Sequence, residues 1–135
     1  MTLGTLKYLY VGSARFPEDL AYYRDVLGGE VVWNFDKFGT QVAAVRVADG
    51  PLVLLAGHRP APGCMPVFAV KNLGTTVAEL ERRGWKPRSG PFEIPDGPCY
   101  VFADPSGNEM AVFGDVRPDA LVRAYADPAN AAAIR

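Results

Sequence analysis

The spacing of apolar positions changes along the chain, and each change predicts a new element. Residues 6–11 are a short run of β-prone side chains. Apolar side chains at helical spacing then predict a helix with one buried face, formed by Phe16, Leu20, Tyr23 and Leu27. Gly28 ends this helix, because glycine adopts the left-handed backbone that closes a helix at little cost. Three strands are predicted after it, at residues 31–35, 40–47 and 52–56.

The same order of elements recurs in the second half of the chain. Pro60-Ala61-Pro62-Gly63 breaks the pattern and is typical of a linker. A predicted strand at 66–70 is followed by a helix that Asn72 caps and Gly84 ends. The remaining strands are predicted around residues 85–88, 99–102 and 110–113, the last two joined by a tight turn at Asp104-Pro105-Ser106-Gly107.

This recurrence is an internal repeat. The helix-ending glycines Gly28 and Gly84 are separated by nearly the same number of residues as the turn glycines Gly50 and Gly107. The predicted fold class is α+β: two βαβββ modules, at about residues 5–58 and 65–114, form an eight-stranded, half-closed barrel with the helices outside. Residues 1–114 make this domain, and residues 115–135 form a C-terminal helical extension, with one helix at 117–125 and another after Asp127-Pro128.

Composition narrows the class of protein. The chain has 135 residues, is 49% hydrophobic and 21% charged, and carries a formal net charge of −1, which fits one globular domain. Its basic residues are scattered, which argues against nucleic-acid binding. No apolar run is long enough to cross a bilayer and no secretory signal is present, so we expect a cytoplasmic protein with no membrane partner. In that compartment Cys64 and Cys99 are expected to be reduced packing residues.

Three motifs in this order resemble a known superfamily. The first predicted helix ends in Tyr-Tyr-Arg-Asp-Val-Leu-Gly at residues 22–28, and the second half contains Phe-Ala-Val-Lys-Asn-Leu at 68–73 and Phe-Ala-Asp-Pro-Ser-Gly-Asn at 102–108. The chain resembles the vicinal oxygen chelate superfamily of glyoxalases, bleomycin-resistance proteins and extradiol dioxygenases over residues 5 to 114. The resemblance implies a cavity inside the barrel that holds either a metal ion or a small molecule.

The resemblance also implies where metal ligands would lie. Members that use a metal place His, Glu or Gln on the first and last strands of each module, and these positions correspond here to Tyr8, Leu55, Met65 and Ala111. Such a residue set cannot supply the converging imidazole or carboxylate donors that a divalent ion needs. The single histidine, His58, also argues against a centre with two His ligands. We therefore expect no metal, no cofactor, and neither glyoxalase nor dioxygenase chemistry of the metal-dependent kind.

Strand alternation then predicts an aromatic and apolar ligand site. The residues expected to line it are Tyr8, Tyr10, Trp33, Phe35, Leu55, Met65, Ala111 and Phe113. Core packing alone competes with ligand contact as the role of each of these side chains. The candidate acid or base groups are Tyr8, Glu109 and His58, although a loop histidine and a turn-adjacent glutamate are usually solvated.

The sequence leaves three kinds of function open. The interpretation that we favour is a metal-free small-molecule-binding protein of the bleomycin-resistance type that holds an apolar or aromatic ligand. A metal-independent enzyme, of isomerase, cyclase or lyase type, is the alternative. A domain that mainly makes protein contacts, with its own side chains filling the pocket, is the third. Pairing of modules in this superfamily further implies a homodimer.

Overall fold

The computed structural model describes residues 2–37 and 39–126, and these fold into two compact units. The β1–β4 unit consists of Tyr8–Cys64 and Leu121–Arg135, and the β5–β8 unit consists of Met1–Lys7 and Met65–Ala120. Their strands belong to one eight-stranded sheet, and we describe the four strands of each unit by themselves.

The β1–β4 unit contains a four-stranded sheet with one helical segment. Its strands are β1 (Thr5–Gly12), β2 (Glu30–Lys37), β3 (Thr40–Arg46) and β4 (Leu52–Ala56), in the spatial order β2-β3-β4-β1. β1 and β4 are parallel, and the other neighbours are antiparallel. The helical segment between β1 and β2 is α1 (Phe16–Ala21) continued by η1 (Tyr22–Val26).

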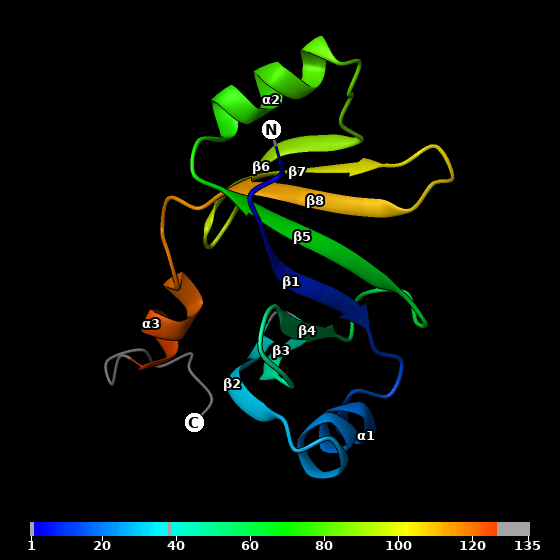
Figure 1. Cartoon of the computed structure of the whole chain (residues 1–135). Coiled ribbons are helices and arrows are strands. Elements are labelled where there is room, and N and C mark those ends of the chain that lie inside the picture. The colour runs from blue at the N-terminus through cyan, green and yellow to red at the C-terminus, as the bar shows by residue number, and fades with distance from the viewer. Residues whose placement is uncertain (1, 38, 127–135) are drawn as a thin grey trace. The chain divides into compact units, whose positions relative to one another are not determined.

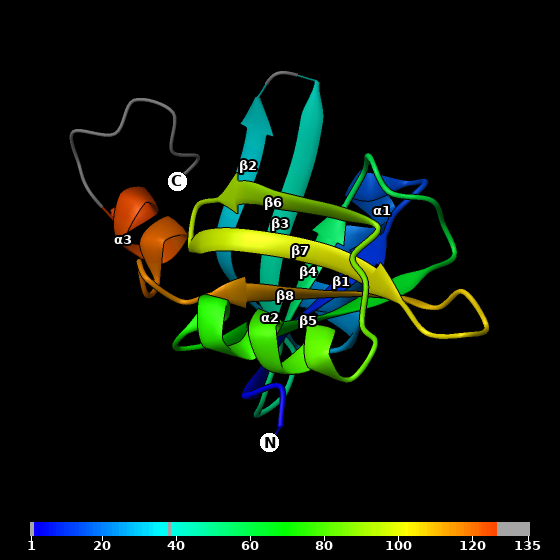
Figure 2. The ribbon, with the colours of Figure 1, turned by 90° about the horizontal axis from the view of Figure 1, so that it is seen from above.

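The β5–β8 unit repeats this arrangement. It consists of β5 (Cys64–Val70), α2 (Leu73–Arg82), β6 (Ser89–Ile94), β7 (Gly97–Ala103) and β8 (Glu109–Gly114), in the order β5-β8-β7-β6. β5 and β8 are parallel, and the remaining pairs are antiparallel. Figures 1 and 2 show α2 lying over one face of this sheet. The α+β class and the repeated βαβββ modules are confirmed.

The segment between β1 and β2 differs from a regular α-helix. Phe16, Leu20 and Tyr23 pack onto the sheet as the spacing predicts, together with the buried Leu55 of β4. From Tyr22 onward the helix is of the π type, and the amide of Leu27 donates to the carbonyl of Tyr22. The wider turn rotates the following side chains, so Leu27 is 43% exposed rather than buried.

Helix α2 begins and ends at the residues that the sequence predicts. The side chain of Asn72 accepts a hydrogen bond from the amide of Thr75 at 3.0 Å, and Gly84 follows the helix with a φ of +93°. Leu73 and Val77 are buried against the sheet. The apolar side of α2, which its periodicity predicts, therefore packs on one face of the β5–β8 sheet.

The strand predicted around residues 85–88 is not formed. The chain there is irregular, and β6 begins only at Ser89. Trp85 instead packs its ring against Tyr100 and Phe102, with ring centroids 5.7 and 5.6 Å apart respectively. β6 lies at the edge of the sheet, which is where Pro91 is tolerated within a strand.

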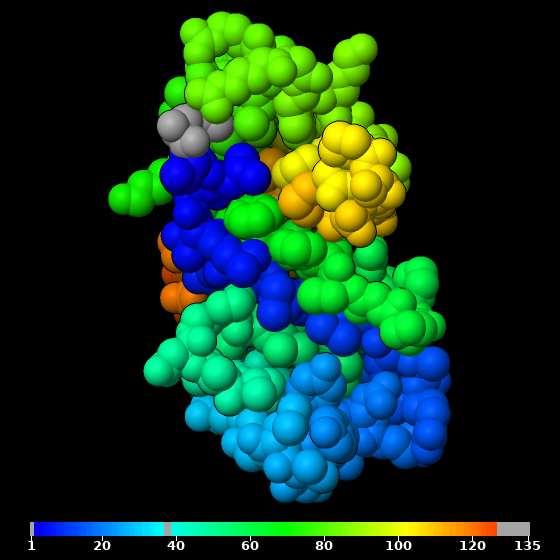
Figure 3. All heavy atoms as spheres, turned by 45° about the vertical axis from the view of Figure 1, so that its right-hand side comes forward, coloured from blue at the N-terminus to red at the C-terminus, as the bar shows by residue number. Residues whose placement is uncertain are grey.

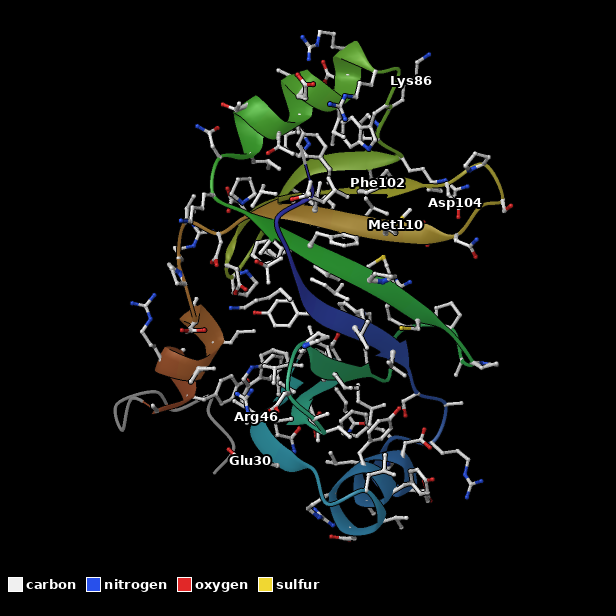
Figure 4. All side chains as sticks on the ribbon, in the orientation of Figure 1. Glu30, Arg46, Lys86, Phe102, Asp104 and Met110 are labelled. Atoms are coloured by element: carbon white, nitrogen blue, oxygen red, sulfur yellow. The ribbon has the colours of Figure 1, made fainter. Side chains whose placement is uncertain are left out.

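The turn between β7 and β8 is organised by one carboxylate. Asp104 accepts hydrogen bonds from the amides of Ser106 and Asn108 and from the Asn108 side chain, at 2.9 to 3.0 Å. Those bonds, above all the side-chain bond from Asn108, hold the pKa of Asp104 below its usual value. Gly107 supplies the left-handed backbone, with a φ of +90°. The turn is exposed at the surface (Figure 3), and in Figure 4 Asp104 marks it, beyond Phe102 of β7 and Met110 of β8.

One helix of the predicted extension is described. α3 (Ala120–Ala126) begins three residues later than the predicted helix at 117–125. The second helix, expected after Asp127-Pro128, lies outside the described residues. Within residues 2–37 and 39–126, no helix combines the length and the apolar character needed to cross a membrane.

Candidate ligand-binding site

Four of the predicted ligand-binding residues lie together on one face of the β1–β4 sheet. Trp33 is buried and packs with half-buried side chains, namely Tyr8, Tyr10 and Phe35. Strand register explains this grouping, because Tyr10 lies opposite Leu54 in β4 while Trp33 lies opposite Ala44 in β3. The small or aliphatic side chains beneath the rings are Val42, Ala44, Leu54 and Ala56. We call this set of residues the aromatic face.

Leu55 does not belong to the aromatic face, contrary to the expectation from the sequence. In the parallel pairing of β1 with β4, Leu55 lies opposite Val11, so its side chain points to the other face of the sheet. There it packs against Phe16 of α1 and is 1% exposed. Leu54 and Ala56 lie on the aromatic face instead, and neither side chain has a donor atom for a metal.

Helix α3 covers part of the aromatic face. Leu121 and Tyr125 pack against the cluster that contains Trp33. The rings of Tyr125 and Trp33 are stacked, with centroids 5.9 Å apart and planes inclined by 16°. Burial of the Tyr125 hydroxyl raises its pKa. The sequence predicted a helix here, but the contact of its tyrosine with Trp33 follows only from the folded chain.

Tyr10 and the only histidine of the chain form a polar pair at this face. The hydroxyl of Tyr10 and Nε2 of His58 are 3.0 Å apart, and the two rings meet edge to face with centroids 5.8 Å apart. The guanidinium of Arg59 lies over the Tyr10 ring, 5.3 Å from its centroid. Burial raises the pKa of Tyr10, while the positive charge of Arg59 acts in the opposite direction. Tyr10 is therefore a phenol at neutral pH and can donate its proton to an unprotonated Nε2 of His58.

A tightly held loop brings His58 and Arg59 to this position. The amide of Gly57 donates to the carbonyl of Gln41 at 2.8 Å, and the amide of Gly12 donates to Gly63 at 3.0 Å. The Pro60 carbonyl approaches Gly12 so closely that a Cβ atom there would overlap it. Because Gly12 has no side chain, the loop can lie against the end of β1, where Tyr10 also lies. His58 is exposed, as a solvated loop histidine is expected to be, yet it contacts the predicted site.

The predicted site residues of the second module share a face of the β5–β8 sheet. Ala111 and Phe113 lie opposite Val67 and Ala69 of β5, on the face that does not carry α2. Met65 occurs on this face by alternation and is 6% exposed, while Ala111 is 2% exposed and Phe113 is fully buried.

Glu109 also alternates onto the face of Ala111, at the start of β8. Its carboxylate forms an ion pair with Arg88 at 3.5 Å, and its side chain is 39% exposed. Glu109 therefore lies next to the β7–β8 turn, where it pairs with a residue of its own unit.

The residues at the implied ligand positions do not fit a divalent metal ion. Tyr8, Met65 and Ala111 occupy three positions, and Leu54 or Ala56 takes the fourth in place of Leu55. Among residues 2–37 and 39–126, no group of three His, Cys, Asp or Glu side chains is placed to hold a metal ion.

Comparison with known proteins defines the family. Residues 6–112 match the Glyoxalase/Bleomycin resistance protein/Dioxygenase superfamily, and the chain therefore belongs to it. None of the curated proteins matches the chain.

Several solved structures share the fold at low sequence identity. Methylmalonyl-CoA epimerase from Mycobacterium tuberculosis is 14% identical, with a TM-score of 0.68 over 83% of this chain and 88% of the epimerase chain. A Streptomyces coelicolor methylmalonyl-CoA epimerase variant in complex with 2-nitronate-propionyl-CoA is 13% identical, with a TM-score of 0.68 over 85% of this chain and 99% of that chain. A hypothetical protein from Bacillus halodurans C-125 has a TM-score of 0.68 at 12% identity, over 81% of this chain and 92% of that chain. At these identities the likeness concerns the fold alone.

Proposed function

We propose that this protein binds a small apolar or aromatic molecule on the aromatic face without a metal ion. The observation that carries the proposal is the grouping of Tyr8, Tyr10, Trp33 and Phe35 on one side of the β1–β4 sheet. Ring faces of this kind contribute about 1 kcal/mol beyond area burial when a second flat ring packs on them. The hydroxyl of Tyr10, with His58 beside it, gives the ligand a polar end to orient on.

Binding of 4-fluorophenol, followed by ¹⁹F NMR, tests this proposal. We expect saturable broadening of the probe signal in the presence of the protein. Phe35→Ala should weaken binding about fivefold, because it removes one half-buried ring of the aromatic face. Phe92→Ala is the matched control, since Phe92 is 41% exposed on β6 of the other unit and should leave binding unchanged. Equal binding by both variants and the unaltered protein would contradict the proposal.

A second function, a metal-independent enzyme, is favoured by one specific contact. The 3.0 Å hydrogen bond between Tyr10 and His58 joins an acid and a base next to the aromatic face. A reaction that moves one proton onto and one proton off a small carbon acid needs such a pair and no metal. Among metal-independent reactions, an isomerase of the keto–enol type is the class that this pair supports best.

Phenylpyruvate tests the second function, because its aromatic ring suits the face and its enol and keto forms differ in ultraviolet absorbance. An enzyme of this class would accelerate their interconversion, and Tyr10→Phe would lower the rate by about a hundredfold. His58→Gln should lower it similarly, while the exposed Tyr22→Phe serves as a control. No acceleration by the unaltered protein would remove this function and leave the binding proposal in place.

A further inference from the structure

The contact between α3 and the aromatic face resembles a ligand contact made by the protein itself. The Tyr125 ring lies parallel to the Trp33 ring, with 5.9 Å between centroids and 16° between planes. This is the geometry that a flat aromatic ligand would adopt on the same surface. Trp33 is 7% exposed in this arrangement, so a ligand ring cannot reach it while Tyr125 is in place.

The chain is firmly held just before α3. The side chain of Arg117 donates to the carbonyls of Pro95 and Ile94 at 2.8 and 3.0 Å, and it pairs with Glu93 at 2.6 Å. The amide of Arg117 also donates to the carbonyl of Asp96 at 2.9 Å. These bonds fix residue 117 within the β5–β8 unit, whatever α3 does.

The helix itself is short and lies at the surface. α3 has seven residues, and none of them is buried. Asp119 immediately before it has a φ of +55°, a left-handed backbone that costs energy for any residue with a side chain. Asp119 pairs with Lys7 at 3.7 Å, and an exposed ion pair of this kind contributes little. Leu121 and Tyr125 of the helix pack on the aromatic face.

We propose that Tyr125 is a built-in competitor for the ligand, and that the ligand class is a single flat aromatic ring. This inference rests on the proposed binding function and adds both the shape of the ligand and its control. A ligand ring reaches Trp33 only in molecules whose α3 has moved away, so the apparent affinity is lowered by the fraction of molecules in that state. An aromatic pair changes an equilibrium constant by about two- to tenfold, and burial of Leu121 adds to the effect.

The experiment measures the affinity for 4-fluorophenol by ¹⁹F NMR in a small set of α3 variants. Tyr125→Ala should bind about tenfold more tightly than the unaltered protein, because the competing ring is gone. Tyr125→Phe keeps the ring and should bind within twofold of the unaltered protein. Val122→Ala changes a 37% exposed residue of the same helix and should also have no effect. The non-planar 4,4-difluorocyclohexanol should bind Tyr125→Ala much more weakly than the phenol does, because it cannot stack on the Trp33 ring.

Each outcome decides a different point. If 4-fluorophenol binds the unaltered protein and Tyr125→Ala equally well, the competition by Tyr125 is wrong, while the proposed binding function stands. If the difluorocyclohexanol binds Tyr125→Ala as tightly as the phenol does, the flat-ring ligand class is wrong. If neither protein binds the phenol, the binding function itself fails. Leu121→Ala, which loosens α3 but keeps Tyr125, should give about a threefold gain and provides the test should Tyr125→Ala fold poorly.

Discussion

Replacement of Leu55 by alanine tests the assignment of the two faces of β4. Leu55 is 1% exposed and packs against Phe16 and Ala43, with Leu20 and Tyr23 of the helical segment beside it. Leu→Ala at a buried site costs about 2.7 to 5 kcal/mol, the larger values applying where the cavity cannot collapse. α1 is short and can shift toward the sheet, so we expect a loss near the lower end, about 3 kcal/mol.

Urea unfolding followed by circular dichroism measures this loss of unfolding free energy. In thermal unfolding, the midpoint temperature should fall by roughly 10 °C. Leu27→Ala is the matched control, because Leu27 is 43% exposed and the same substitution there should cost less than about 1 kcal/mol. Leu55→Ala should leave 4-fluorophenol binding unchanged below the unfolding transition, whereas Leu54→Ala should weaken it. The assignment would be refuted if Leu55→Ala lowered the free energy of unfolding by less than about 1 kcal/mol, or if this variant bound 4-fluorophenol more weakly than the unaltered protein.

Three further outcomes are expected. Gly12→Ala should destabilise the protein and break the contact of Tyr10 with the His58 loop, because the new Cβ would overlap the Pro60 carbonyl; unchanged thermal stability would contradict this. Burial raises the pKa of the Cys99 thiol to about 11, so Ellman's reagent at pH 8 should label the exposed Cys64 and leave Cys99 unmodified until the protein unfolds. Asp104→Asn should flatten the acid side of the stability profile: hydrogen bonds lower the pKa of Asp104, so its contribution is present above the unfolded pKa and is lost as the pH falls through the folded one.

The fold could be predicted largely because the residues that begin and end its helices and turns act through local contacts. Asn72 and Gly84 bound α2, and Asp104 with Gly107 forms the β7–β8 turn through contacts within five residues. Local chemistry of this kind is present in the sequence itself. The strand predicted around residues 85–88 failed because Trp85 packs as a loop side chain on two rings of the sheet, a tertiary contact that strand propensity does not contain.

The candidate site could be predicted only in part, because the sequence does not show which strands pair and in which register. Leu52 to Leu55 is an unbroken apolar run, so alternation cannot show which of its residues lie on the aromatic face. The parallel pairing with β1 decides it, and it places Leu54 beside Tyr10. Trp33 and Phe35 of β2 lie on the same face, as strand alternation predicts, because both follow the bulge between Val31 and Trp33.

Two contacts of the site were outside the reach of the sequence. His58 meets Tyr10 because the loop folds back over Gly12, and Tyr125 meets Trp33 because the extension returns to the β1–β4 unit. Both contacts join residues far apart in the chain, with nothing in the local pattern to mark them. The sequence singled out the lone histidine but not Tyr125, and it showed the partner of neither residue.

The π-helical turn η1 has a consequence for protein engineering. A π turn is an α-helix that has taken up one additional residue, and the extra residue is absorbed locally without disturbing the flanking elements. Tyr22 and Val26 within it are 52% and 67% exposed, so little packing depends on them. Deletion of one exposed residue such as Arg24 should restore a regular α-helix and leave Leu27 in its present, exposed orientation. We therefore expect the chain to tolerate a change of length in this segment.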